Sequence, residues 1–398
     1  MNTPMQHLVQ KTLLILLLGL TLFGCGRLIV GGNPENTPTV NFEYFTDAVR
    51  ENYTFFNEKR VSWDSLERHY RPLVNDRMSN DSLYDVFAAM LSTLDDGHVN
   101  FYTDFDRSRN HSFVYDYPTN YNVDVILRNY ITTDYISTGA FQHNWLRDSV
   151  GYVSYASFGS RFTGRQLNYV LNRYAPGKGL ILDLRNNGGG SMSRMYAIVQ
   201  RFLSEPTFLG TMQYKNGPGP NDFSVLDSIH VKPTVDYAER ARKKAEQEAK
   251  KKKKAKEEDE QPTETTAKVD SLATMPKSLA GTWAVADSTA TWQTKPVVVL
   301  VGRQTYSAAN FCSAFLSTLP HVTLIGDTTG GGGGVPVSFE LPNGWKFRLS
   351  ATRTYLPDGT DIEAGVAPDI FQATGYAEAA VGEDAILERA LALLSSRR

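Results

Sequence analysis

The feature of this sequence that most constrains its fold is the stretch from Pro296 to Leu319, where a strand pattern runs directly into a helix pattern. Residues 296–301 form a β-branched apolar run bounded by Pro and Gly, which is typical of a buried strand. After a polar turn, apolar residues recur at helical spacing from Ser307 onward. A serine at this place is either a helix N-cap or a nucleophile beside the unpaired N–H groups and positive end of the helix. Taken alone, the stretch favours the N-cap, because serine is among the commonest capping residues.

Strand and helix patterns alternate from residue 151 to residue 325, which predicts an α/β core with a largely parallel sheet. One of the strand patterns, Gly179 to Leu184, leads into the glycine run 188–190. Loops at the carboxyl ends of such strands are where α/β sheets place their sites. Glycine lets the backbone approach a ligand closely and turn its N–H groups toward it. Neither phosphate-binding spacing, GxGxxG or GxxxxGKS/T, fits this run, so we discount phosphate binding.

The first 24 residues predict a lipoprotein signal peptide. Lys11 precedes the apolar run 13–24, which is too short to span a bilayer, since that takes roughly 20 residues. The run ends in Leu22-Phe23-Gly24-Cys25, which resembles the bacterial lipobox and implies cleavage before Cys25 with a lipid on its thiol. An ordinary signal peptide that contains a cysteine is the alternative. Residues 25–40, rich in Gly, Pro and Asn, are interpreted as a tether, so we expect a chain anchored to a membrane of the bacterial cell envelope.

The remaining chain divides into three parts by its patterns. Residues 41–98 carry apolar and aromatic positions at helical spacing, which predicts a small helical N-terminal domain. Residues 99–150 are interpreted as a connector, because they are short for an independent domain, and residues 151–398 as the α/β core. Within the core, residues 237–285 begin with a block of Lys followed by acids, which predicts a solvated, disordered insertion. Contact of the basic block with anionic lipid head groups is an alternative role for it.

Charge and cysteine content exclude several function classes. The formal net charge of −2 gives no electrostatic reason to expect nucleic acid as a partner. The two cysteines, Cys25 and Cys312, cannot form a disulfide framework or a thiolate metal site. With Cys25 assigned to the lipid, Cys312 is expected to be a lone buried apolar residue. We predict neither a metal nor an organic cofactor.

Three polar side chains stand where elements end: His98, Ser307 and Glu363. A hydroxyl attacks a carbonyl only when a base removes its proton, and the base in turn needs an orienting partner. These three residue types meet that need, and a second glycine run, 330–334, lies between two of them in sequence. Each has a simpler explanation: a lone histidine is more often structural, and Glu363 could be a solvated loop carboxylate. Spacing along the chain does not show whether the three side chains converge.

Five motifs occur along the chain in the order GYVSYASF, GLILDLRNNGGG, VVVLVGRQTYSAANF, LIGDTTGGG and IEAGVAPDI. In sequence and order they resemble the motifs of the tail-specific (C-terminal processing) protease family. The resemblance implies a crotonase-like (ClpP-like) α/β core with a helical N-terminal part, and a protein or peptide as substrate. The nucleophile of the family falls on Ser307, and the oxyanion donors fall on the N–H of Ala308 and on Gly188 or Gly189.

The chain departs from the common pattern of that family at the base. Many members place a Lys after the glycine turn, whereas this chain has Gly331-Gly332 and no Lys between Ser307 and Lys346. It is more similar to the branch of tricorn protease and the interphotoreceptor retinoid-binding repeats, whose base and carboxylate fall on His98 and Glu363. Gly97 replaces the Ser of that branch, so the link from Glu363 to His98 is expected to be direct or through water. The 99–150 connector leaves no room for the PDZ domain of other members.

The sequence therefore predicts a serine endopeptidase with Ser307, His98 and Glu363 as its catalytic set. The retinoid-binding repeats suggest an alternative, a non-catalytic protein that binds apolar ligands or peptides on the same fold. A third hypothesis is an interaction scaffold that acts through the Lys-rich insertion. The sequence does not predict an oligomeric state.

Overall fold

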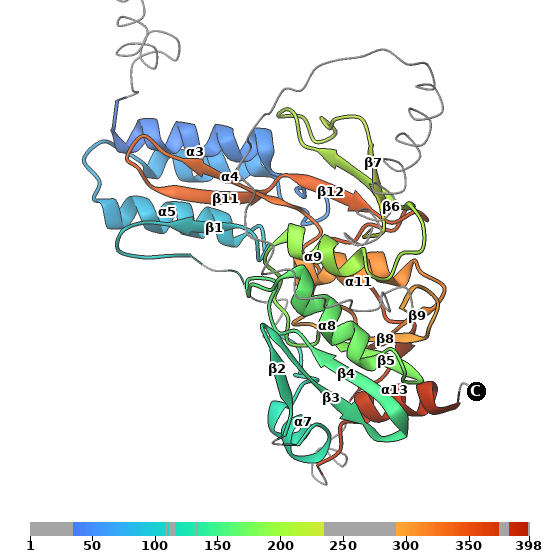
Figure 1. Ribbon diagram of the computed structural model, residues 1–398. Helices are drawn as coiled ribbons and strands as arrows, with labels where there is room; N and C mark the ends of the chain where they lie inside the picture. Colours follow the sequence, from blue (N-terminus) through green and yellow to red (C-terminus); the bar gives the residue numbers. More distant parts are fainter. Residues whose placement is uncertain are drawn as a thin grey trace, which may run out of the picture. The chain divides into compact units, whose positions relative to one another are not determined.

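The computed structural model describes residues 35–108, 110, 116–132, 134–234, 292–373 and 382–396 (Figure 1). The predicted signal peptide with Cys25 and the charged insertion 237–285 lie outside the described residues. The chain divides into two compact units: unit 1 comprises Met1–His111, Tyr214–Ser224 and Pro336–Ala351, and unit 2 comprises the rest. Among the described residues, no helix is both long and apolar enough to cross a bilayer.

In its described residues, unit 1 combines three α-helices with a three-stranded antiparallel sheet of order β1-β11-β10. The side chain of Thr37 caps the first helix by accepting from Val40 N–H, and Pro38 occupies its first turn, where a missing N–H costs nothing. The apolar faces of the helices and the sheet enclose a core rich in aromatic rings, such as Phe45, Phe87 and Phe347. The elements are α3 (Pro38–Asn52), α4 (Trp63–Tyr70), α5 (Asn80–Ser92), β1 (Asn100–Tyr102), β10 (Pro336–Glu340) and β11 (Lys346–Ser350).

The hairpin β10–β11 belongs to unit 1, although we placed residues 336–350 in the α/β core from the sequence. Its turn includes Gly344, which has φ +84°. Phe347 and Leu349 are buried in the aromatic core of unit 1, and β11 pairs with β1. Strand periodicity predicts which face of a hairpin is apolar but not which core receives it, so local patterns could not make this assignment.

Unit 2 is built on a seven-stranded sheet of order β13-β9-β8-β5-β4-β3-β2. The strands from β13 to β4 are parallel, as predicted, and β3 and β2 extend the sheet in antiparallel pairing. A second, smaller sheet has the order β12-β6-β7. The strands are β2 (Ile136–Thr138), β3 (Phe141–Leu146), β4 (Val150–Ser154), β5 (Gly179–Asp183), β6 (Thr207–Tyr214), β7 (Asp227–Val231), β8 (Val297–Val301), β9 (Val322–Gly326), β12 (Thr352–Tyr355) and β13 (Ile370–Phe371).

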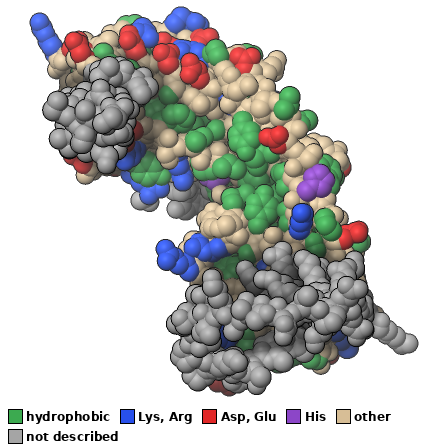
Figure 2. Space-filling view, turned by 45° about the horizontal axis from the view of Figure 1, so that its top comes forward, with side chains coloured by type: hydrophobic (Ala, Val, Ile, Leu, Met, Phe, Trp, Pro, Cys, Tyr) green, Lys and Arg blue, Asp and Glu red, His purple; other side chains and the backbone are tan. Residues whose placement is uncertain are grey.

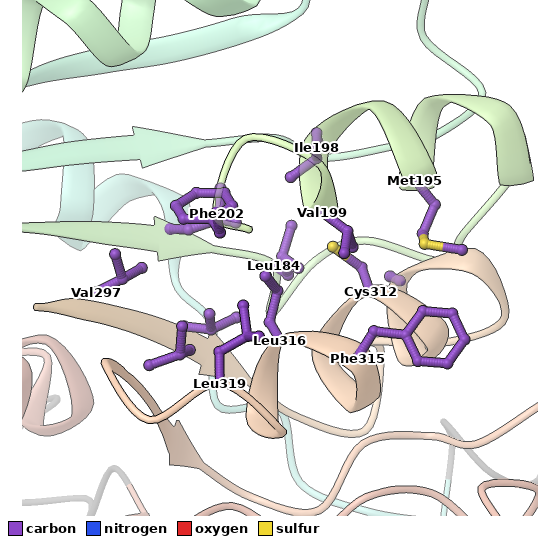
Figure 3. Close-up of a cluster of buried hydrophobic side chains, with 14 of the residues drawn as sticks. Leu184, Met195, Ile198, Val199, Phe202, Val297, Cys312, Phe315, Leu316 and Leu319 are labelled. Carbon is purple, nitrogen blue, oxygen red and sulfur yellow. The ribbon is translucent and has the colours of Figure 1, made fainter. Parts of the chain in front are cut away.

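Helices cover both faces of the large sheet, so alternate residues of each central strand enter different cores. On one face, α8, α9 and α11 pack against strand residues such as Val297 and Leu182, and Figure 3 shows the buried Cys312 facing Val199 of α9. The opposite face packs against α7 and α13. The mixed α/β class predicted from the sequence is confirmed. The helices of unit 2 are α7 (Val123–Asn129), α8 (Gly164–Tyr174), α9 (Met192–Val199), α11 (Ala308–Ser317) and α13 (Ala385–Ser396).

The predicted connector is part of this fold. It supplies β2 and β3, and its segment Val123–Asn129 forms helix α7. The Oδ1 of Asn122 accepts from the N–H groups of Asp124 and Val125, so an N-cap starts a helix that the apolar pattern did not indicate.

Acidic and basic side chains are interspersed on the face of the molecule in Figure 2.

Candidate active site

Ser307 has a backbone conformation that serine rarely adopts. Its φ is 57° and its ψ is −124°, and Ala309 N–H donates to the carbonyl of Tyr306 at 3.0 Å. Residues 306–309 therefore form a type II′ turn with Ser307 at the first central position, where glycine is preferred. A non-glycine residue in such a conformation costs on the order of 1–3 kcal/mol. Ser307 precedes helix α11, but its side chain makes no capping hydrogen bond, so capping does not explain the serine.

Backbone hydrogen bonds to both glycine runs hold this turn. Tyr306 N–H donates to the carbonyl of Asn187 at 3.1 Å, and Ser307 N–H donates to the carbonyl of Gly331 at 2.9 Å. Each run follows a strand of the large sheet, β5 or β9, and the turn follows β8 between them. The three loops thus meet at the carboxyl ends of neighbouring parallel strands, which is where the alternating patterns of the sequence predicted a site.

The first glycine run approaches Ser307 so closely that only glycine fits. Gly189 has φ +94°, and a Cβ on it would lie 2.6 Å from the Cβ of Ser307 and 2.9 Å from the N of Ala308. The N–H of Gly189 donates to Asn187 Oδ1 at 2.9 Å. A Cβ on Gly188 would meet no atom within 4 Å. Of the two glycines named from the sequence, Gly189 has its N–H engaged within the loop. The N–H of Gly188 is therefore the better candidate for a hydrogen-bond donor to an oxyanion.

Asn187 organises this loop and was not singled out by the sequence. Its side chain is fully buried, and its Nδ2 donates to the carbonyl of Tyr155 at 2.6 Å. Its Oδ1 accepts from Phe158 N–H at 3.3 Å as well as from Gly189. One amide therefore ties the loops after β4 and β5 together. In the sequence, the signal for this role of Asn187 is its position directly before a glycine run at the end of a strand.

Glu363 lies against the second glycine run. Its Oε2 accepts from Gly334 N–H at 3.0 Å, and its carbonyl accepts from Gly332 N–H at 3.0 Å. The side chain is half-buried and held by the backbone, unlike a solvated loop carboxylate. The N–H of Glu363 donates to Oδ1 of Asp361, a carboxyl group whose pKa is raised by burial.

The same run leaves no room for a lysine at the place where many relatives of the resembled family carry one. A Cβ on Gly331 would lie 2.1 Å from the carbonyl oxygen of Glu363, and one on Gly332 would lie 2.5 Å from the Tyr306 ring. Both glycines have positive φ, +83° and +76°. These contacts are with backbone and a buried ring, so a side chain at either position requires the Ser307 turn or the Glu363 loop to move.

His98 belongs to unit 1, whereas Ser307, Ala308, the two glycines and Glu363 belong to unit 2. It lies between α5 and β1, is 4% exposed, and its N–H donates to Asp96 Oδ1 at 2.8 Å. In unit 2, His143 is occupied elsewhere, because its Nδ1 bonds with the Tyr174 hydroxyl at 2.7 Å and its Nε2 with Thr138 Oγ1 at 2.9 Å. Burial lowers the pKa of His143 to about 4, so it is a neutral structural histidine.

No group of three or more His, Cys, Asp or Glu in the described part of the chain could hold a metal ion. A buried charge cluster in the described part of unit 2 is structural. Arg185, fully buried beneath the first glycine run, pairs with Asp183 at 2.7 Å and with Asp384 at 2.8 Å. Both partners neutralise its charge within the fold, so the cluster fixes the end of β5 rather than offering a site.

Comparisons with known proteins agree with the resemblance seen in the sequence. The model of peptidase family S41 matches residues 149–371, and that of the tricorn protease C1 domain matches residues 34–92. A solved relative, a putative peptidase from Parabacteroides merdae, is 34% identical with a TM-score of 0.71, and the match covers 92% of this chain and 98% of that one. Mature CPAF shares the fold at 10% identity, with a TM-score of 0.53 over 90% of this chain and 96% of that one.

A curated relative is the carboxy-terminal processing protease CtpA of Bacillus subtilis (strain 168). It is 25% identical over 226 residues, which are 56% of this chain and 35% of that protein. The chain thus spans about a third of the length of this relative. The assignment to the C-terminal processing proteases, made from the five motifs, and to their tricorn-related branch, made from the residues at the base, is confirmed.

Proposed function

The chain belongs to peptidase family S41, and from this premise we propose that it is a serine endopeptidase with Ser307 as nucleophile. The observation that supports this assignment best is the type II′ turn at Ser307. A serine is kept in a glycine conformation at a helix start, without capping the helix. Strained conformations of this kind cluster at active sites, where the surrounding structure holds them.

In the proposed reaction the Ser307 hydroxyl attacks the carbonyl carbon of a peptide bond. His98 removes the hydroxyl proton and passes it to the leaving amine, and Glu363 stabilises the imidazolium that forms. The N–H groups of Ala308 and Gly188 are the proposed donors to the tetrahedral oxyanion, each worth about 10²- to 10³-fold in rate. These steps use only side chains and backbone of this chain and need no metal or organic cofactor.

We also assign the core of unit 2 to the crotonase-like (ClpP-like) class. The support is a largely parallel sheet with helices on both faces, together with glycine loops that present N–H groups at the strand ends. Such loops suit the stabilisation of an oxyanion. The five motifs of the resembled family lie within or beside these loops.

The test is labelling with a fluorophosphonate, which reacts with an activated serine and forms a stable adduct. We expect the full chain to be labelled at Ser307 and to cleave an unfolded protein substrate, because activation by a base is what both reactions require. Mass spectrometry of the labelled peptide identifies the site, and heat-denatured protein is the control. A chain that binds peptides or apolar ligands but forms no adduct at Ser307 would instead support the non-catalytic alternative.

We further propose that a lipid on Cys25 tethers the chain to a membrane of the bacterial cell envelope. The support is the lipobox-like Leu22–Cys25 after a short apolar run. Cells fed an alkyne fatty acid are expected to label the wild-type protein and not Cys25→Ala, since that residue carries the lipid. Cys312→Ala, at a buried position, is the control that keeps the label. Undiminished label on Cys25→Ala contradicts the anchor.

A further inference from the structure

The Glu363 loop is attached to the helix that follows the nucleophile by one buried amide, that of Asn310. Asn310 lies three residues after Ser307 on α11 and is fully buried. Its Nδ2 donates to the carbonyl of Ile362, the residue before Glu363, at 2.8 Å. We propose that Asn310 is the positioning residue that fixes Glu363 relative to Ser307, an inference that rests on the proposed function.

Asn310 acts on the other side of Glu363 as well, through Thr329. The Oδ1 of Asn310 accepts from Thr329 Oγ1 at 2.6 Å, and that same Oγ1 accepts from Val366 N–H at 2.6 Å. Thr329 N–H donates to the carbonyl of Val366 at 3.0 Å. The backbone is therefore held both before and after Glu363, at residues 362 and 366.

The approach between these segments is too close for the loop to shift without breaking the hydrogen bonds. A Cβ on Gly365, which has φ +100°, would lie 2.3 Å from the carbonyl oxygen of Thr329. Asn310 and Thr329 are both fully buried, so neither can exchange a lost partner for bulk water. An amide suits the position because it offers a donor to Ile362 and an acceptor to Thr329 at once.

Fixing the loop to α11 matters for the reaction because Ser307 directly precedes the same helix and the Ala308 N–H belongs to its first residue. The Asn310 amide thus couples the position of the carboxylate to the position of the nucleophile within one rigid element. A misplacement of about 1 Å in such a set lowers the rate about 100-fold. A buried amide that served only the stability of the core would not be coupled to Glu363.

The decisive experiment is a double-mutant cycle between Asn310→Asp and Glu363→Gln. Asn310→Asp keeps the size and the acceptor but loses the donor to Ile362 and brings a carboxylate against that carbonyl. We expect kcat to fall about 100-fold with little change in KM. In the Glu363→Gln background the same change is expected to cost several-fold at most, because the group it positions is already lost.

Ser313→Ala is the matched control, since Ser313 is fully buried on the same helix and its hydroxyl donates only within the helix, to the carbonyl of Ala309 at 2.9 Å. It is expected to show no coupling with Glu363→Gln. Thr329→Val keeps the shape of the side chain and removes Oγ1. It is the second variant, for use in case the Asn310→Asp protein does not fold, and it is expected to show the same loss of kcat and the same coupling with Glu363→Gln. Equal losses from Asn310→Asp in both backgrounds overturn the proposal.

Amide hydrogen exchange separates a failure of this inference from a failure of the proposed function. The N–H of Gly334 donates to the Glu363 carboxylate, so its protection reports where that side chain lies. Faster exchange at Gly334 in Asn310→Asp supports the positioning role even in a chain that forms no fluorophosphonate adduct. Exchange at Gly334 that equals the wild-type rate overturns it, whatever the activity.

Discussion

Replacing Ser307 with alanine is expected to lower kcat/KM for an unfolded protein substrate by about 10⁴- to 10⁶-fold while the fold is kept. The loss is large because the nucleophile and its base act as a unit, so that removal of one leaves only binding and oxyanion stabilisation. The fold is kept because alanine retains the Cβ and makes the same backbone hydrogen bonds, and because the lost hydroxyl does not cap α11. Steady-state hydrolysis and a urea unfolding curve measure the two effects.

The glycine variant tests the strain at the same position. Ser307→Gly removes the Cβ from a residue with φ 57° and ψ −124°, so we expect it to be as inactive as the alanine variant and more stable by about 1 kcal/mol. The gain is smaller than the full strain because glycine also raises the entropy of the unfolded chain. Ser317→Ala, at the last turn of α11, is the control for activity. Glycine and alanine variants of equal stability would show that the turn is not strained.

The sequence predicted the α/β part of the fold well because its central strands are short apolar runs followed by helix-period segments. Val297–Val301 and Gly179–Asp183 are such strands, and the loops after them hold Ser307 and the glycines of the candidate site. The strand-to-helix order alone places these loops at one edge of a parallel sheet. This is why loops more than a hundred positions apart in the chain could be expected at the same edge of the sheet.

What the sequence could not predict depends on tertiary contacts that leave no local pattern. The sequence of the hairpin β10–β11 predicts a pair of strands whichever core the hairpin packs against, so its place in unit 1 was missed. Asn187 and Asn310 look like ordinary polar residues beside a glycine run and within a helix. Their roles follow from backbone groups that they bind 32 and 52 positions away, at Tyr155 and Ile362. The strained φ of Ser307 is likewise visible only in coordinates.

Substitutions in the glycine run after β5 are expected to give the second large loss of activity. Comparing alanine at Gly189 with alanine at Gly188 distinguishes the possible causes of that loss. Gly189→Ala is expected to lower kcat by about 10³-fold or more, because the added Cβ would lie 2.6 Å from the Cβ of Ser307 and 2.9 Å from the Ala308 N. That methyl group occupies the space in which an oxyanion would accept hydrogen bonds, and loss of one donor alone costs about 10²- to 10³-fold. Alanine at φ +94° adds strain of about 1–2 kcal/mol, which a lower urea midpoint would reveal.

Gly188→Ala is the matched control, because the same methyl group there meets no atom within 4 Å and the N–H of residue 188 is retained. We expect this variant to unfold at the wild-type urea concentration and to keep far more activity than Gly189→Ala. The comparison distinguishes a blocked oxyanion site from a loop that tolerates no substitution. If both variants lose activity equally while both stay folded, the flexibility of the glycine run matters more than the space beside Ala308. If neither loses activity, the oxyanion cannot form at Gly188 and Ala308, and the attack by Ser307 must take place from another side.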